Sequence, residues 1–195
     1  APFIAPGLVG GATTEDEGLR LVQQVQPDLL LLTEDLETGY GIRLMQRVHE
    51  HGAGTRMLIF LSRETQEVVQ EAMQAHADGV IFRSSMGSGR GDFIQAVQTL
   101  SRGGVYYPED VRQMVVSLHR DDRPQFIETL SEREKEVVRA VARGLTNGEI
   151  ATAFQISTET VKSHVSNCMN KLAVRDRTQL AVSALLYGLI DPQAV

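Results

Sequence analysis

Three helix starts crowd into one short segment, and this segment constrains the fold more than any other part of the chain. Ser131 and Glu134 have the spacing of a capping box, in which a hydroxyl and a carboxylate bind free amides at a helix start. Thr146 and Glu149 repeat the pattern. Ser157, a third N-cap candidate, follows at a distance that leaves room for a short helix and a tight turn. The sequence therefore predicts helix-turn-helix geometry.

The helix predicted over 161–172 has two faces of different chemistry. Its inward face carries apolar residues at helical spacing, namely Val161, Val165, Cys168 and Leu172. The outward face is polar, small and cationic. Such a face suits the major groove of DNA, where Lys and Asn reach base edges and Ser or Thr bind bases or phosphates. Double-stranded DNA is therefore the predicted partner.

Family motifs run through this part of the chain in order: Leu-Ser-x-Arg-Glu, Gly-Leu-x-Asn-x-Glu-Ile-Ala, Thr-Val-Lys-x-His, Lys-Leu and Arg-x-Arg-Thr. With them, residues 130–190 resemble the DNA-binding domain of LuxR/NarL-type transcription regulators. The resemblance implies four helices, with 161–172 as the recognition helix and a last helix at about 178–187 that pairs two copies.

The same resemblance assigns roles to individual side chains. It implies that bases face Lys162, Ser163 and Ser166, and that the DNA backbone lies near Thr160, His164, Asn167, Lys171 and Arg175. The last helix presents more apolar surface than one small domain needs, at Leu180, Ala181, Ala184 and Leu185. A homodimer is expected.

Length and charge fit a chain of two domains. A chain of 195 residues with 42% apolar content can bury two small cores. The net charge of −6 comes from the first part, which has 11 basic and 17 acidic residues before Ile127, against eight of each after it. The second part is thus relatively cationic, as a partner for phosphates should be.

Helix-like and strand-like segments alternate in the first part. The helices are predicted over 17–25, 40–49, 64–75 and 93–100, and the strands over 28–32, 57–61 and 79–82. Such alternation predicts a parallel sheet with helices on both faces.

With Pro27-Asp28, the Asp78-Gly79 step and the ending at 103–108, this part resembles the receiver domain of two-component response regulators. The resemblance implies a flavodoxin-like, doubly wound α/β fold. Residues 8–12 resemble its second strand. The first strand and first helix have no counterpart in residues 1–7, either because the natural protein lacks them or because this chain is a shortened version of it. The expected organisation is a receiver-like domain over 1–114, a linker over 115–126 and a LuxR-type helix-turn-helix domain over 127–195.

The receiver pattern is broken at the positions that carry its chemistry. Thr33 stands where the phosphorylated aspartate is expected, and Arg83 stands in place of the lysine that binds the phosphoryl group. Val80 replaces the aromatic switch residue, whereas Ser62 keeps the switch hydroxyl. The acidic pair that binds Mg²⁺ belongs to the strand without a counterpart. The sequence therefore predicts a pseudo-receiver that aspartyl phosphorylation does not switch.

Two other functions remain open. A phosphorylation-dependent regulator could use a displaced acceptor, Asp35 or Glu34, and a scaffold or antagonist could have lost DNA binding. The outward face of the recognition helix argues against the scaffold. We expect a transcription regulator rather than an enzyme, controlled by a regulatory protein, by a small ligand at the receiver-like domain, or by its abundance.

Other candidate sites have simpler interpretations. The carboxylates of Glu34, Asp35 and Glu37 are expected to be solvated, and the glycine-rich run 87–91 lacks the ending of a P-loop. His49 and His51 lack a second pair of ligands, so no metal or cofactor is predicted. Cys168, the single cysteine, is expected in the core. With no apolar run of membrane length and no signal peptide, the resemblance implies a cytoplasmic protein.

Overall fold

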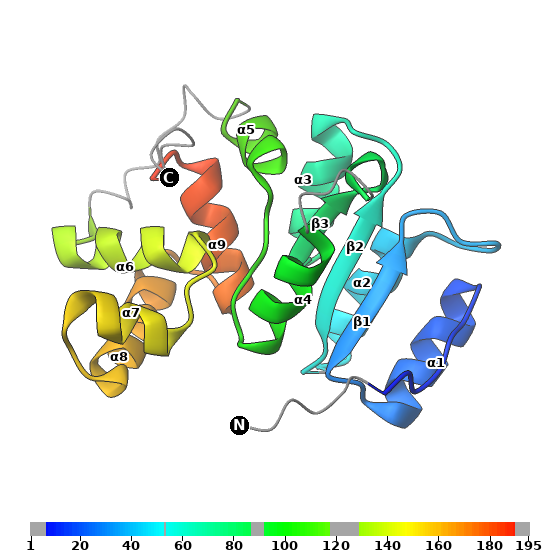
Figure 1. Cartoon of the computed structure of the whole chain (residues 1–195), viewed down its shortest axis with the longest axis horizontal. Coiled ribbons are helices and arrows are strands. Elements are labelled where there is room, and N and C mark those ends of the chain that lie inside the picture. The colour runs from blue at the N-terminus through cyan, green and yellow to red at the C-terminus, as the bar shows by residue number, and fades with distance from the viewer. Residues whose placement is uncertain (1–6, 53, 87–91, 118–128, 190–195) are drawn as a thin grey trace.

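The structure is a computed structural model that describes residues 7–52, 54–86, 92–117 and 129–189. Figure 1 shows two parts that lie side by side, one built around a sheet and one entirely helical. The glycine-rich run 87–91 and most of the expected linker fall outside the described ranges. Among the described residues, every helix is too short or too polar to traverse a lipid bilayer.

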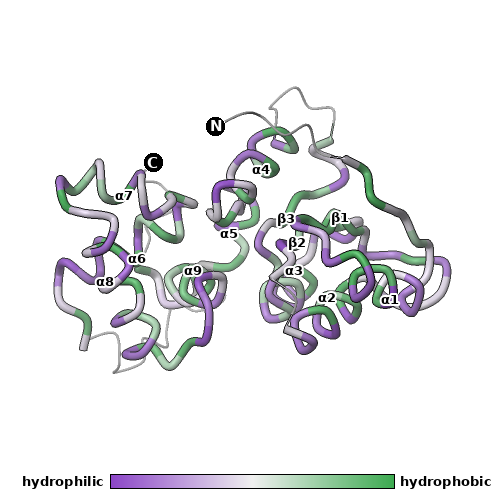
Figure 2. Tube along the Cα trace, turned by 90° about the horizontal axis from the view of Figure 1, so that it is seen from below, coloured by the Kyte–Doolittle hydropathy of each residue, from purple (hydrophilic) through white to green (hydrophobic). Residues whose placement is uncertain are grey.

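The sheet has three parallel strands in the described part of the chain. They are β1 (Leu29–Thr33), β2 (Arg56–Leu61) and β3 (Gly79–Phe82), paired in the order β1-β2-β3. On one side lie α1 (Glu15–Val25), α2 (Gly41–Glu50) and α3 (Gln66–Gln74), and on the other α4 (Asp92–Ser101), as Figure 2 shows. The predicted α/β architecture is confirmed.

Alternate strand residues supply two separate cores. One face contributes Leu32, Met57, Ile59, Leu61, Val80 and Phe82 to the core beneath α2 and α3. The other contributes Leu58, Phe60 and Ile81, which pack against α4. Beyond α4, the described residues leave part of this second face uncovered, and Leu31 of β1 is 47% exposed.

The predicted strand at 8–12 is wrong. Residues 7–12 form no strand, and Leu8 and Val9 are 95% and 60% exposed. A strand exists only where it pairs, and this segment instead leads to Thr14, which bridges Thr38 and caps α1 by accepting from the Glu17 amide. Apolar side chains alone therefore do not make this segment a strand.

The helical part contains α6 (Glu132–Ala142), α7 (Asn147–Phe154), α8 (Thr158–Lys171) and α9 (Arg177–Leu186). Both predicted capping boxes form, with reciprocal bonds between Ser131 and Glu134 and between Thr146 and Glu149. Ser157 caps α8 by accepting from the Thr160 amide. The four-helix domain is confirmed.

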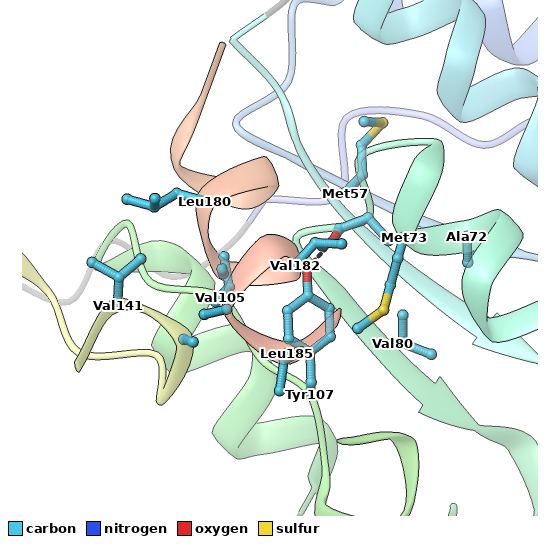
Figure 3. Close-up of a cluster of buried hydrophobic side chains, with 14 of the residues drawn as sticks. Met57, Ala72, Met73, Val80, Val105, Tyr107, Val141, Leu180, Val182 and Leu185 are labelled. Atoms are coloured by element: carbon cyan, nitrogen blue, oxygen red, sulfur yellow. Dashed lines mark hydrogen bonds between the residues drawn. The ribbon is translucent and has the colours of Figure 1, made fainter. Parts of the chain in front are cut away.

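Helix α5 (Glu109–Ser117) was not predicted from the sequence. Its signals are a proline and two carboxylates in a row at the helix start, Pro108-Glu109-Asp110. The helix overlaps the expected linker and contacts both α3 and α9. One apolar core therefore continues from the sheet into the helical part, as Figure 3 shows for Met73, Tyr107 and Leu185.

Candidate DNA-binding surface and receiver site

The outward face of α8 is exposed as the sequence predicted. Thr160, Lys162, Ser163, Ser166 and Asn167 are exposed, and His164 is half-buried. Val161, Val165 and Cys168 are buried against the other helices, and burial raises the pKa of the Cys168 thiol to about 12. The helix therefore presents one continuous polar face to solvent.

Lys162 lies free of the protein core on this face. Its ammonium group is 3.1 Å from the Glu159 carboxylate, and both side chains are more than half exposed. Such a surface ion pair contributes little to stability, so Lys162 can exchange it for a phosphate or a base edge.

Lys171 has a different environment at the end of the same helix. Its ammonium group donates to the Glu134 carboxylate at 2.7 Å and to the Thr129 carbonyl oxygen at 3.2 Å. Lys171 and the Ser131 amide lower the pKa of Glu134 to about 2. Lys171 thus links the end of α8 to the start of α6. Arg175, which follows α8, is exposed.

The receiver site at the end of β1 has no free acceptor in the expected place. Thr33 is exposed, and its hydroxyl donates to the carbonyl oxygen of Asp35 at 2.7 Å. Asp35 itself is exposed and bridges Tyr40 through the backbone. The turn after β1 therefore closes on itself around the position where the sequence predicts the acceptor.

Glu34 is wholly buried and held by three groups at the end of β2. Its carboxylate accepts from the amides of Ser62 and Arg63 at 3.1 Å each, and it forms an ion pair with the Arg63 guanidinium. This bond raises the pKa of Arg63. The expectation that the Glu34 carboxylate is solvated is therefore wrong. Glu34 and Arg63 lie far apart in the sequence, so the local pattern does not indicate their pairing.

A second layer of bonds surrounds this ion pair. The Tyr40 hydroxyl donates to the Glu71 carboxylate at 2.8 Å and accepts from Arg63 at 3.0 Å. Burial and the Glu71 carboxylate raise the pKa of Tyr40 to about 12, so the hydroxyl stays protonated.

Of the remaining predicted receiver residues, Arg83 and Ser62 contact each other and Val80 lies in the core. Arg83 donates to the Ser62 hydroxyl at 3.3 Å, so these two side chains meet at the carboxyl ends of β2 and β3. Val80 is fully buried on the sheet face beneath α3. Val80, at the predicted switch position, therefore belongs to the core.

The apolar face of α9 packs inside the chain. Leu180, Ala181, Ala184 and Leu185 have no exposed surface, and α9 contacts α3, α5, α6 and α8. Figure 3 shows Leu180 and Leu185 in the same apolar cluster as Val105 and Tyr107. Pairing of two copies through these four residues therefore requires α9 to give up some of these contacts.

Polar contacts add to this interface. The Thr178 hydroxyl of α9 donates at 2.8 Å to Asp78, whose carboxylate also accepts from the Arg56 guanidinium at 2.7 Å and the Met57 amide at 2.9 Å. Elsewhere the backbones of the two parts are in direct contact at Gly104 and Gly144. A Cβ atom on Gly104 would overlap the Gly144 carbonyl oxygen. The docking is therefore specific as well as apolar.

A cationic cavity of about 460 Å³ opens between the two parts, lined by Arg56, Arg102, Gly103, Thr146, Asn147, Gly148 and Arg177. Burial and the nearby Arg56 lower the pKa of Arg177 to about 10. Arg177 donates to Asn147 at 3.0 Å and to the Leu145 carbonyl oxygen. The cavity is the right size for a small ligand, and its charge favours anions.

Comparison with known families agrees with this two-part structure. Residues 7–88 match the family described as response regulator receiver domain, and residues 128–184 match bacterial regulatory proteins of the luxR family. The response regulator protein VraR of Staphylococcus aureus strain Mu3 is 32% identical over 185 residues, which cover 94% of this chain and 86% of VraR. VraR of strain NCTC 8325 is 31% identical over the same length.

Solved structures resemble the fold at lower identity. The RcsB response regulator of Salmonella typhimurium superposes with a TM-score of 0.50 at 21% identity, over 94% of this chain and 85% of RcsB. A structure of two RcsB dimers bound to two parallel DNAs gives a TM-score of 0.51 at 21% identity, over 93% and 84%.

Proposed function

Since the chain belongs to the LuxR family of response regulators, which are DNA-binding transcription regulators and not enzymes, we propose that it reads a specific DNA sequence through α8 without control by aspartyl phosphate. The observation that carries the proposal is the exposed polar face of α8, presented by a helix whose opposite face is buried. Lys162, Ser163 and Ser166 contact bases, and Thr160, His164, Asn167, Lys171 and Arg175 serve the DNA backbone. Because Lys171 already binds Glu134, its share is the smallest of these.

Replacing Lys162 with alanine is expected to weaken specific DNA binding by about 1–3 kcal/mol if the ammonium group contacts a base. The fold should be unaffected, because the side chain is 61% exposed. A gel-shift titration on the selected operator measures the change.

Lys135→Ala is the matched control, because Lys135 also pairs with a glutamate three residues away but lies on α6. Equal affinity of the Lys162→Ala variant and the parent protein would contradict the assignment of this face.

The proposal that aspartyl phosphate does not control this protein rests on the side chains at the end of β1. Phosphoryl transfer to a receiver needs a carboxylate nucleophile, a metal ion held by carboxylates and a cation near the departing charge. Thr33 supplies no carboxylate, and the buried Glu34 carboxylate is already bound to Arg63 and to two amides. The exposed Asp35 is the alternative acceptor that remains accessible.

Acetyl phosphate with Mg²⁺ is therefore expected to leave both the mass of the protein and its DNA affinity unchanged. Intact-mass spectrometry and gel shift measure these outcomes on the same sample. An added phosphoryl group that is lost in Asp35→Asn, together with a change in DNA affinity, would favour the displaced-acceptor alternative.

We further propose that the DNA-bound form is a homodimer joined through Leu180, Ala181, Ala184 and Leu185 of α9. The domains are proposed to span residues 1–114 and 127–195, with 115–126 as linker, although α5 shows that order continues into the start of that linker. Control by a regulatory protein or by a small ligand remains the proposed signal, and the arginine-lined cavity supports an anionic ligand.

Two copies of the protein are expected on each duplex that carries an inverted repeat, with recognition helices about one DNA turn, roughly 34 Å, apart. Analytical ultracentrifugation of the complex measures the stoichiometry. One copy per duplex at saturation would refute pairing through α9.

A further inference from the structure

Two histidines and one aspartate meet where α9 docks on the receiver-like domain. His49 comes from the end of α2, His76 follows α3, and Asp176 is the N-cap of α9. A hundred residues separate His76 from Asp176 in sequence. None of the three belongs to the predicted DNA-binding or receiver sites.

The donor atoms of this cluster already lie near one another. His76 Nδ1 is 3.1 Å from Asp176 Oδ2, and His49 Nε2 is 3.9 Å from the same oxygen. All three donor atoms lie within 4.8 Å of one another. Bonds of about 2.0–2.2 Å at tetrahedral angles would hold such ligand atoms about 3.3–3.6 Å apart. The two separations from the Asp176 oxygen are therefore close to those of a metal site before any ion is bound.

From this geometry we propose that His49, His76 and Asp176 bind one divalent transition-metal ion, with Zn²⁺ as its simplest representative. Imidazole nitrogen and carboxylate oxygen are ordinary zinc ligands, and three of them leave one position for water. The two imidazole rings are now stacked, with centroids 3.4 Å apart and planes inclined by 6°. Binding requires these rings to tilt so that both nitrogens point at the ion.

A metal ion would take the place of the hydrogen between His76 Nδ1 and Asp176 Oδ2, because a ligating imidazole nitrogen carries no proton. The side chains are 38%, 15% and 31% exposed for His49, His76 and Asp176, so an ion can enter from solvent.

An ion at this position would join the two parts of the chain. Its histidine ligands belong to the receiver-like domain and its carboxylate to Asp176, the N-cap of α9. Bound metal therefore stabilises the docked arrangement, in which the apolar face of α9 is buried. This consequence rests on the proposed function: metal binding should oppose α9-mediated pairing and weaken DNA binding.

The test is calorimetric titration of the metal-free full chain with Zn²⁺, with Co²⁺ as a spectroscopic probe of the same site. We expect one ion per chain, and at least about tenfold weaker binding in His49→Ala and in His76→Ala. Asp176→Asn should also weaken binding while it retains an N-cap residue for α9.

His51→Ala is the matched control, because His51 is an exposed histidine two residues from His49 and outside the cluster. Circular dichroism melting confirms that each variant is folded. Absence of stoichiometric binding by the parent protein, or equal affinity in the His49 and His76 variants, would overturn the site.

A gel shift with and without Zn²⁺ tests the effect of metal binding on DNA affinity separately from metal binding itself. Weaker DNA binding with Zn²⁺ in the parent protein but not in His49→Ala supports domain locking. Unchanged DNA affinity despite stoichiometric Zn²⁺ binding overturns the locking role. Failure to bind DNA in either condition would instead count against the proposed function.

Discussion

Asp78→Ala is expected to destabilise the protein by about 3–5 kcal/mol, because it removes a buried charge from a bonded network. The Asp78 side chain is 7% exposed, and its carboxylate accepts from Arg56, from the Met57 amide and from Thr178. The substitution leaves a guanidinium, an amide and a hydroxyl without their acceptor. Urea denaturation measures the loss as a lower midpoint.

Thr178→Val is the matched control for the same network. It removes only one neutral donor, so the expected cost is about 1 kcal/mol. The Thr178→Val substitution removes the one bond that the helical part donates to Asp78, and Asp78 keeps its bonds to Arg56 and the Met57 amide. Equal destabilisation by the two substitutions would mean that the carboxylate is not the centre of this network.

Local signals made the helical part predictable from sequence. A capping box joins residues only three positions apart, so the bonds at Ser131 and Thr146 follow from the local sequence. The inward stripe of α8 follows in the same way from helical periodicity, and Val161, Val165 and Cys168 are buried as predicted.

Other elements depended on partners that local sequence does not specify. Residues 8–12 have strand-like side chains, but no neighbouring strand pairs with them among the described residues. The apolar face of α9 fits either a second copy or the receiver-like domain, since burial of apolar surface is not directional. In this structure α9 packs mainly against α6 of its own domain and also against α3 and α5, so that face is covered within one chain.

The polar contacts between the two parts were beyond prediction for a related reason. His76 and Asp176, like Asp78 and Thr178, are separated by 100 residues and come together only when the domains dock. The sequence placed His49 beside His51 as a weak pair of ligands, whereas the folded chain pairs His49 with His76. Spacing along the chain cannot reveal such a cluster.

Gly41→Ala is expected to cost about 3–5 kcal/mol, because the added methyl group has no space beside rigid backbone. A Cβ atom at this position would overlap the Thr33 carbonyl oxygen and lie 3.1 Å from the Glu34 carbonyl oxygen. The Gly41 amide also donates to that Glu34 oxygen at 2.8 Å, so the helix start cannot move away without losing this bond. Thermal and urea unfolding measure the effect.

Gly54→Ala provides the comparison, because a Cβ atom at Gly54 meets nothing within 4 Å. With open space and an unstrained backbone, this substitution is expected to be neutral or to stabilise by about 0.4–1 kcal/mol. The Gly41 variant should also disturb the Glu34–Arg63 ion pair, because both depend on the turn after β1. A Gly41→Ala variant as stable as Gly54→Ala would show that this turn relaxes freely. The bonds that hold Glu34 and Thr33 in this turn could then rearrange easily. They would no longer explain why phosphorylation does not switch the receiver.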